Sequence, residues 1–199
     1  MLTTTRVPSA ARLDSELLVR LRDLEQRGGE SYTGDGRHGW RNPIRTDTGP
    51  ILSALVLAHE PRRVLEIGTA YGLSGSYLAA ALGDNAMLDT IEFCEEVALE
   101  AQAHFDAADL PVRVHCGDAL DVIARLDGPY DVVFLDADKR SYLAHLRALS
   151  HLLSEGALII ADNVVDRAAE MRDFLAFVTG ELEHVLVPTE CGLLVARWK

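Results

Sequence analysis

Two short acidic segments carry residue types that suit metal binding. Asp136 and Asp138 directly follow one apolar run, and Asp162 and Asn163 directly follow the next apolar run. Carboxylate and amide oxygens are hard ligands that bind Mg²⁺, Mn²⁺ or Ca²⁺ and leave positions open for water or a substrate. We therefore predict a divalent-cation site formed by Asp136, Asp162 and Asn163. The aspartates alone also fit an alternative role as helix caps or loop charges.

Lys139 follows Asp138 at the start of a predicted helix. A lysine at a helix N-terminus opposes the helix dipole, so its presence there calls for a compensating interaction. A lysine held among other charged groups can act as a general base. Lys139 and Asp136 are therefore the candidate catalytic residues, and the alternative is a surface ion pair between Lys139 and Asp136 or Asp138.

A glycine-rich turn joins another apolar run to a predicted helix and contains Gly68, Thr69 and Gly72. Glycine permits a tight turn and close approach of a ligand to the backbone, and the N–H groups of a helix start attract polar or negative groups. Glu92 ends the next apolar run, about 20 residues further on, where a carboxylate can accept hydrogen bonds from ribose hydroxyls. An ordinary strand–helix turn and a solvated charge are the simpler alternatives.

Asp118 ends the third apolar run, where it either caps the next helix or accepts a hydrogen bond from an adenine amino group. Together with the glycine turn and Glu92, it predicts an adenosine site. Two details favour S-adenosylmethionine over a nicotinamide dinucleotide. Glu66, near the end of its strand, suits a cationic amino acid better than a pyrophosphate. The turn also lacks the Gly-x-Gly-x-x-Gly spacing that accommodates two phosphates.

Short apolar runs alternate with helical segments from about residue 46 onward, which predicts an α/β, Rossmann-like doubly wound sheet with helices on both faces. The predicted strands cover residues 64–67, 87–91, 112–115, 132–135, 157–161, 185–187 and 193–196. The predicted helices between them lie near 73–82, 95–107, 119–126, 140–153 and 166–179. The last two strands are joined by a short turn, so we expect them to pair antiparallel. The candidate side chains then meet at the carboxyl edge of the sheet.

Leucines at helical spacing predict an N-terminal amphipathic helix that Gly28 and Gly29 stop. A second helix is predicted from near Thr48 to just before Pro61. The loop between these helices is locally basic over residues 37–45 and contains Trp40. It could form a lid with Trp40 stacked on an aromatic substrate, but we favour an ordinary surface loop with Trp40 packed inward.

The composition predicts one soluble domain of 199 residues, with 31 acidic residues against 19 basic ones and a formal charge of −12. This charge disfavours binding to nucleic acid. The first ten residues lack a secretion signal and no run is long enough to span a membrane, so we expect a cytoplasmic protein. The three cysteines, Cys94, Cys116 and Cys191, are widely spaced and predict reduced thiols without a zinc site.

The motifs VLEIGTAYGLS, IEF, GDA, FLDADK and ADN stand in this chain in an order and spacing that resemble the cation-dependent O-methyltransferases. This family includes the catechol and the caffeoyl-coenzyme A O-methyltransferases. The resemblance covers roughly residues 46–199. It implies a seven-stranded Rossmann-like sheet with an antiparallel last strand. It also implies a single methyltransferase domain over 1–199, in which 1–45 add the N-terminal helix and lid-like loop, and a homodimer.

The resemblance also assigns roles to individual residues. The cofactor residues that it implies are Glu66, Gly68 and Ser74 at the methionine end, Glu92 at the ribose, Asp118 and Ala119 at the adenine, and Asp138 near the amino group, with Thr69 and Gly72 in the same glycine turn and Asp136 also counted among the cofactor-binding residues. Asp136, Asp162 and Asn163 would bind the metal, Mg²⁺ before Mn²⁺ or Ca²⁺, and Lys139 would be the base. One departure is that Val164, Val165 and Asp166 are expected to run straight into a helix, without the longer insertion of many relatives.

The activity implied by the resemblance is the metal-dependent transfer of a methyl group from S-adenosylmethionine to a hydroxyl of a small catechol-like or phenolic substrate. Three alternatives stay open. They are methylation of a transfer RNA hydroxyuridine, which the negative charge disfavours, cofactor binding without catalysis, and a nicotinamide-dependent dehydrogenase.

Overall fold

The structure is a computed structural model that describes residues 15–30 and 43–199. Its elements, in chain order, are α1 (Ser15–Glu30), α2 (Thr48–His59), β1 (Arg63–Ile67), α3 (Leu73–Ala80), β2 (Met87–Glu92), α4 (Glu95–Ala107), β3 (Val112–Cys116), α5 (Ala119–Ile123), β4 (Tyr130–Leu135), the 3₁₀ turn η1 (Lys139–Ser141), α6 (Tyr142–Leu149), the 3₁₀ turn η2 (Ser150–Leu152), β5 (Leu153–Ala161), α7 (Arg172–Glu181), β6 (Glu183–Val187) and β7 (Leu193–Arg197). The part of the predicted loop that holds Trp40 lies outside the described residues. No helix within the described ranges is long and apolar enough to cross a membrane.

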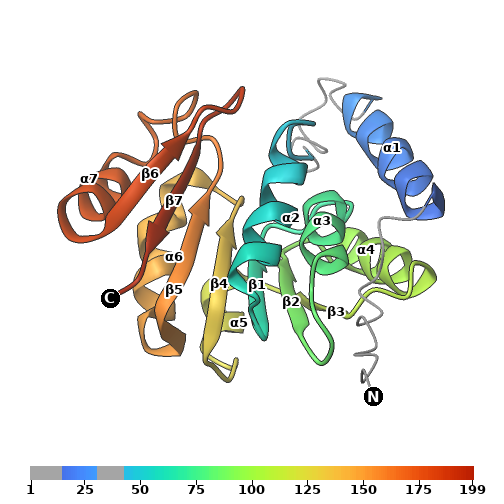
Figure 1. Cartoon of the computed structure of the whole chain (residues 1–199), viewed down its shortest axis with the longest axis horizontal. Helices are drawn as coiled ribbons and strands as arrows, with labels where there is room; N and C mark the ends of the chain where they lie inside the picture. The colour runs from blue at the N-terminus through green and yellow to red at the C-terminus, as the bar shows by residue number, and fades with distance from the viewer. Residues whose placement is uncertain (1–14, 31–42) are drawn as a thin grey trace, which may run out of the picture.

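The seven strands form one sheet in the order β3-β2-β1-β4-β5-β7-β6, which Figure 1 shows from right to left. Strands β1 to β5 pair parallel, whereas β7 pairs antiparallel with both β5 and β6. This confirms the predicted Rossmann-like sheet and its antiparallel end. The strand order reverses between β1 and β4, and ligands of such sheets bind beyond the carboxyl ends of the strands at this switch point.

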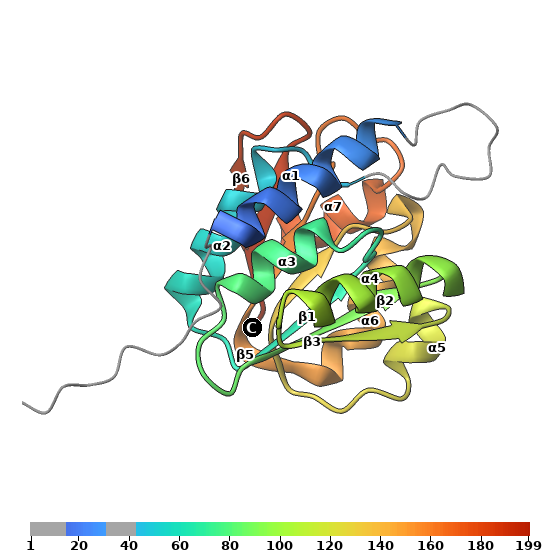
Figure 2. The same cartoon turned by 90° about the vertical axis from the view of Figure 1, so that its right-hand side faces the viewer.

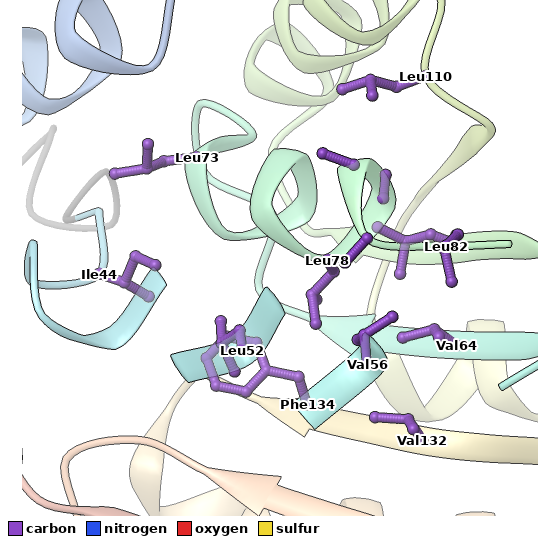
Figure 3. Packing of buried hydrophobic residues seen from close by; sticks show 14 of the residues in the cluster. Ile44, Leu52, Val56, Val64, Leu73, Leu78, Leu82, Leu110, Val132 and Phe134 are labelled. Atoms are coloured by element: carbon purple, nitrogen blue, oxygen red, sulfur yellow. The ribbon is translucent and has the colours of Figure 1, made fainter. Parts of the chain in front are cut away.

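Helices cover both faces of the sheet, as the view in Figure 2 shows for α3 and α4 against α5 and α6. Successive strand residues point to opposite faces, so Val64 of β1 joins the apolar cluster under α1–α4 and the next residue, Leu65, joins the cluster under α5–α7. Figure 3 shows Leu52 and Val56 of α2 packed beside Phe134 of β4. Apolar contacts on both faces explain why the strands read as continuous apolar runs.

The predicted end of the first helix and the predicted start of the last helix are wrong. Helix α1 continues through Gly28 and Gly29 to Glu30, because a glycine costs a helix only about 1 kcal/mol and does not by itself end it. Helix α7 begins at Arg172, so the chain after Asn163 does not run straight into a helix. Residues 164–170 form turns instead, because the backbone N–H groups at the start of this segment bond to the 191–192 turn before β7.

Candidate functional site

Three neighbouring strands end at one place on the sheet edge. Leu135 of β4 is in register with both Ile67 of β1 and Ala161 of β5. Beyond this register the pairing continues for one more residue, since the Asp136 N–H donates to the Ile67 carbonyl at 2.9 Å and the Asp162 N–H donates to the Leu135 carbonyl at 3.1 Å. The two predicted acidic segments therefore leave the sheet side by side.

Gly68 is required at this junction by the close approach of two strand ends. Its φ is +105°, and a Cβ at this position would lie 2.3 Å from the backbone carbonyl oxygen of Asp136. Any side chain would both clash and strain the backbone. The packing of β1 against β4 thus accounts for Gly68 independently of any contact with a cofactor.

Glu66 is fully buried on the face of the sheet covered by α3. Its Oε2 accepts a hydrogen bond from the Thr90 hydroxyl at 2.6 Å, whereas Oε1 has no hydrogen-bond partner within the described residues. Burial raises the pKa of Glu66 to about 8 and outweighs the lowering effects of Ser74 and Thr90. A buried carboxyl with one free oxygen is suited to a cationic or hydrogen-bond-donating ligand group.

Glu92 is held in place by two backbone groups at the end of β2. Its Oε2 accepts from the N–H of Ala70 in the glycine turn, and its Oε1 accepts from the N–H of Cys94, each at 3.0 Å. The carboxylate is thus tied to the turn after β1 and to the start of α4. Each carboxylate oxygen keeps lone-pair capacity for a further donor, such as a ribose hydroxyl.

Two other predicted cofactor residues have local partners on the surface. The exposed Asp118 side chain caps α5 by accepting from the Leu120 N–H at 2.9 Å, so its capping role is confirmed. Ala119 is the first residue of that helix. Asp138 is also exposed and accepts from the Ser141 hydroxyl at 2.9 Å. These bonds leave other carboxylate lone pairs available to a ligand.

Lys139 and Asp136 form an ion pair that is shielded from solvent. The Lys139 Nζ lies 2.6 Å from the Asp136 Oδ1, and their side chains are 11% and 12% exposed. The Lys139 Nζ also donates to the Tyr142 hydroxyl at 2.9 Å, and that hydroxyl donates to the Asp162 carbonyl at 3.4 Å. The ion pair given as the alternative does form with Asp136, but it is not on the surface. Tyr142 also links Lys139 to the second acidic segment at Asp162.

Asp162 is an acid that the fold leaves incompletely paired. It is 2% exposed, and its Oδ1 has no hydrogen-bond partner in the described part of the chain. Burial, reinforced by the negative charge of Asp136, raises the pKa of Asp162 to about 7. Asp136 pairs with the Lys139 ammonium group and Asp162 keeps an oxygen without a partner in the described residues, so an added cation would stabilise both carboxylates.

Asn163 completes the candidate ligand set with an amide oxygen. Within ranges 15–30 and 43–199, no group of three or more His, Cys, Asp and Glu side chains is arranged to hold a metal ion. Asp136 and Asp162 supply two carboxylates, so the site depends on Asn163 for its third protein ligand. Two carboxylates and one amide oxygen fit a hard divalent cation that keeps positions open for other oxygen ligands.

Three residues near the site were not predicted from the sequence. Thr90 bonds Glu66, Tyr142 bonds Lys139, and Asp166 accepts from the Asn163 amide. Tyr142 and Asp166 each lie three residues after their partner, a spacing that brings side chains together in helices and turns. Thr90 lies two residues before Glu92 on the same face of β2, so the alternation of side chains along a strand could have predicted that it lies near the site.

Comparison with known proteins shows the family to which this chain belongs. A family model described as O-methyltransferase matches residues 36–172, which is more than half of the chain. A catechol O-methyltransferase from Mycobacterium tuberculosis is 37% identical over 128 residues, which cover 63% of this chain and 58% of that protein. The chain thus spans less than two thirds of the length of the curated relatives that it matches first, 58% in each of two.

Solved structures extend the similarity over nearly the whole chain. An O-methyltransferase from Bacillus cereus in complex with SAH is 26% identical, with a TM-score of 0.78 and 91% of each chain covered. The O-methyltransferase TomG from Streptomyces achromogenes, involved in tomaymycin synthesis and in complex with SAM, is 26% identical, with a TM-score of 0.78 and 99% of each chain covered. By its family match and its fold, this chain belongs to the O-methyltransferase family.

Proposed function

We propose that this chain transfers a methyl group from S-adenosylmethionine to a hydroxyl oxygen of a small catechol-like or phenolic molecule, with the help of a divalent cation. The observation that supports this most directly is the shielded pair of Lys139 and Asp136, which lies beside Asp162 at the strand ends. It combines a candidate base with candidate cation ligands next to the glycine turn. The single domain over residues 1–199 and the homodimer remain predictions.

The cofactor site in this proposal extends across the ends of β1, β2 and β3. S-adenosylmethionine supplies a sulfonium methyl group, which is electrophilic without further activation. The free Oε1 of Glu66 receives the amino group of the methionine part, and we assign Ser74 and Asp138 to the same end of the cofactor. Glu92 accepts from the ribose hydroxyls, and Asp118 with Ala119 borders the adenine. Relatives with the same fold have been solved with SAM and with SAH, which supports S-adenosylmethionine as the cofactor.

The cation residues in this proposal are Asp136, Asp162 and Asn163, and the unpartnered Oδ1 of Asp162 supports their assignment. A bound cation lowers the pKa of a hydroxyl that it contacts. Lys139 is the proposed base: after its ammonium group, which pairs with Asp136 in this structure, has released a proton to solvent, the neutral amine can take the proton from that hydroxyl. The protein then aligns the resulting oxygen with the methyl carbon, and such alignment contributes on the order of several kcal/mol to catalysis.

A methyl-transfer screen tests this function. Purified protein is incubated with labelled S-adenosylmethionine and with catechols, hydroxycinnamates, flavonoids or transfer RNA that carries hydroxyuridine, each with Mg²⁺ and with EDTA. We expect methylation of a vicinal diphenol with Mg²⁺, loss of the product with EDTA, and recovery when Mg²⁺ is added back in excess.

Each other result contradicts a different part of the proposal. Turnover that persists in EDTA rejects the cation. Turnover of transfer RNA without turnover of any phenol favours the RNA alternative. Binding of S-adenosylmethionine without turnover of any substrate favours a non-catalytic protein.

A further inference from the structure

The Asn163 side chain can contribute to a cation site only in one orientation. A carboxamide is planar, and its oxygen and NH₂ ends have nearly the same shape, but only the oxygen can bind a cation. In this structure the Asn163 Nδ2 donates to both carboxylate oxygens of Asp166, at 3.2 Å to Oδ1 and 3.3 Å to Oδ2. The NH₂ end is therefore held by Asp166, which leaves the oxygen end for another partner.

Asp166 itself is held by the turn that precedes β7. The N–H groups of Val165 and Asp166 both donate to the Cys191 carbonyl, at 3.0 Å and 3.4 Å. The next residue of that turn, Gly192, has φ +78°, and a Cβ there would lie 2.3 Å from the Cγ2 atom of Val165. The path from Asn163 to Asp166 is thus packed against a second segment of the chain, which limits the positions open to the Asp166 carboxylate.

We propose that Asp166 is a positioning residue of the cation site, which holds the NH₂ group of Asn163 so that the amide oxygen is directed to the cation. This inference rests on the proposed function, because it needs a cation bound by Asp136, Asp162 and Asn163. It goes beyond that function by assigning a role to a residue outside the ligand set.

The charge of Asp166 contributes separately. Asp166 lies near enough to Asp136 for its negative charge to help raise the pKa of that carboxyl, after the larger effect of burial. The same charge attracts a divalent cation, and salt weakens this attraction by screening it. Orientation of Asn163 and attraction by Asp166 therefore predict different responses to substitution of Asp166.

Binding of Mn²⁺, followed by the loss of the free-ion signal in electron paramagnetic resonance, separates the two effects without any turnover. Asp166→Asn keeps an oxygen that accepts from Asn163 but loses the charge, whereas Asp166→Ala loses both. We expect Asp166→Ala to weaken Mn²⁺ binding about tenfold or more, as is usual for residues that orient metal ligands. Asp166→Asn should weaken it about threefold, and less at high salt. Asp84→Asn removes an equal charge from an exposed turn elsewhere and should bind Mn²⁺ like the parent.

Asn163→Asp gives a sharper control, because a carboxylate presents an oxygen at either end. In that background, Asp166→Ala should weaken Mn²⁺ binding by no more than the roughly threefold loss expected from its charge alone, because the orientation of residue 163 no longer matters. A double-mutant cycle measures this difference between the two backgrounds, and circular dichroism with thermal unfolding verifies that each variant is folded.

Three results would overturn the inference. They are Asp166→Ala binding like the parent, Asp166→Asn losing as much affinity as Asp166→Ala, and an equal loss in both backgrounds. A parent protein that binds no Mn²⁺ would reject the proposed cation site itself, and this inference with it.

Discussion

Glu66 and Asp162 are ionisable side chains that the fold removes from water. Burial raises the pKa of Glu66 to about 8 and that of Asp162 to about 7. A raised pKa means that the ionised form is disfavoured in the folded chain, so these groups lower stability as the pH rises from their ordinary range toward those values. Each also has one oxygen without a partner in the described residues. Cationic ligand groups at both positions would offset this cost, which is consistent with the proposed site.

Replacing Lys139 tests the proposed base. Lys139→Ala should lower kcat by about 10²- to 10⁴-fold, the usual contribution of a general base. The affinity for S-adenosylmethionine, measured by calorimetry, should stay within about threefold of the parent, because Lys139 contacts Asp136 and Tyr142 rather than Glu66 or Glu92.

Lys199→Ala is the matched control. The Lys199 side chain is 72% exposed, and its ion-pair partner is Glu181, which is not a residue of the proposed site. It should leave kcat unchanged. A folded Lys139→Ala protein with parental kcat would show that another group takes the proton.

At the scale of elements, the site depends on the junction of β1 with β4. Gly68→Ala should lower the free energy of unfolding by about 2 kcal/mol or more, because the added methyl group meets the Asp136 carbonyl in a backbone conformation that disfavours alanine. Urea denaturation measures the loss. The affinity for S-adenosylmethionine should fall as well, since the glycine turn shifts.

Gly83→Ala serves as its control. Apart from its chain neighbours, no residue has an atom within 4 Å of a Cβ built at Gly83, so the change in stability should stay within about 0.5 kcal/mol. Equal stability of the two variants would mean that β1 and β4 separate at little cost.

Some strands and helices begin or end at residues other than those that local sequence patterns predict. The strand predicted at 157–161 begins at Leu153 instead, because the pairing of β4 with β5 shifts register between Tyr130 and Val132. Such an irregularity interrupts the apolar run without ending the strand. The helix predicted over 140–153 is similarly divided into η1, α6 and η2. These deviations arise from pairing between segments that are distant along the chain, so a short stretch of sequence does not predict them.

At the scale of the whole molecule, a buried charge network joins four strands away from the proposed site. Asp89 of β2 accepts from Arg63 of β1 at 2.8 Å and from Tyr130 of β4 at 2.9 Å, and it bonds His115 of β3 at 2.8 Å. Burial alone would raise the pKa of Asp89, but these hydrogen bonds outweigh it and lower the pKa to about 2.

Acid unfolding tests this network. A depressed pKa contributes stability that is present above the ordinary value of 3.8 and is lost as the pH falls toward 2. Asp89→Asn should lower the free energy of unfolding at pH 7 by about 2 kcal/mol, and the difference from the parent should shrink between pH 4 and pH 2. Urea denaturation across this range measures it, with Asp84→Asn as the exposed control. A difference that is independent of pH would assign the effect to packing instead.

The sequence by itself determined the order of strands and helices, the antiparallel end of the sheet and the residue types at the carboxyl edge. These follow from local periodicity and from the direction of parallel strands, which need no coordinates. Only the tertiary structure decided that Lys139 is shielded with Asp136, that Gly68 is required by the Asp136 carbonyl, and that Asp166 holds Asn163. The physical reason is that these contacts depend on strand register and on the path of loops across the sheet edge, which are set by packing between distant segments.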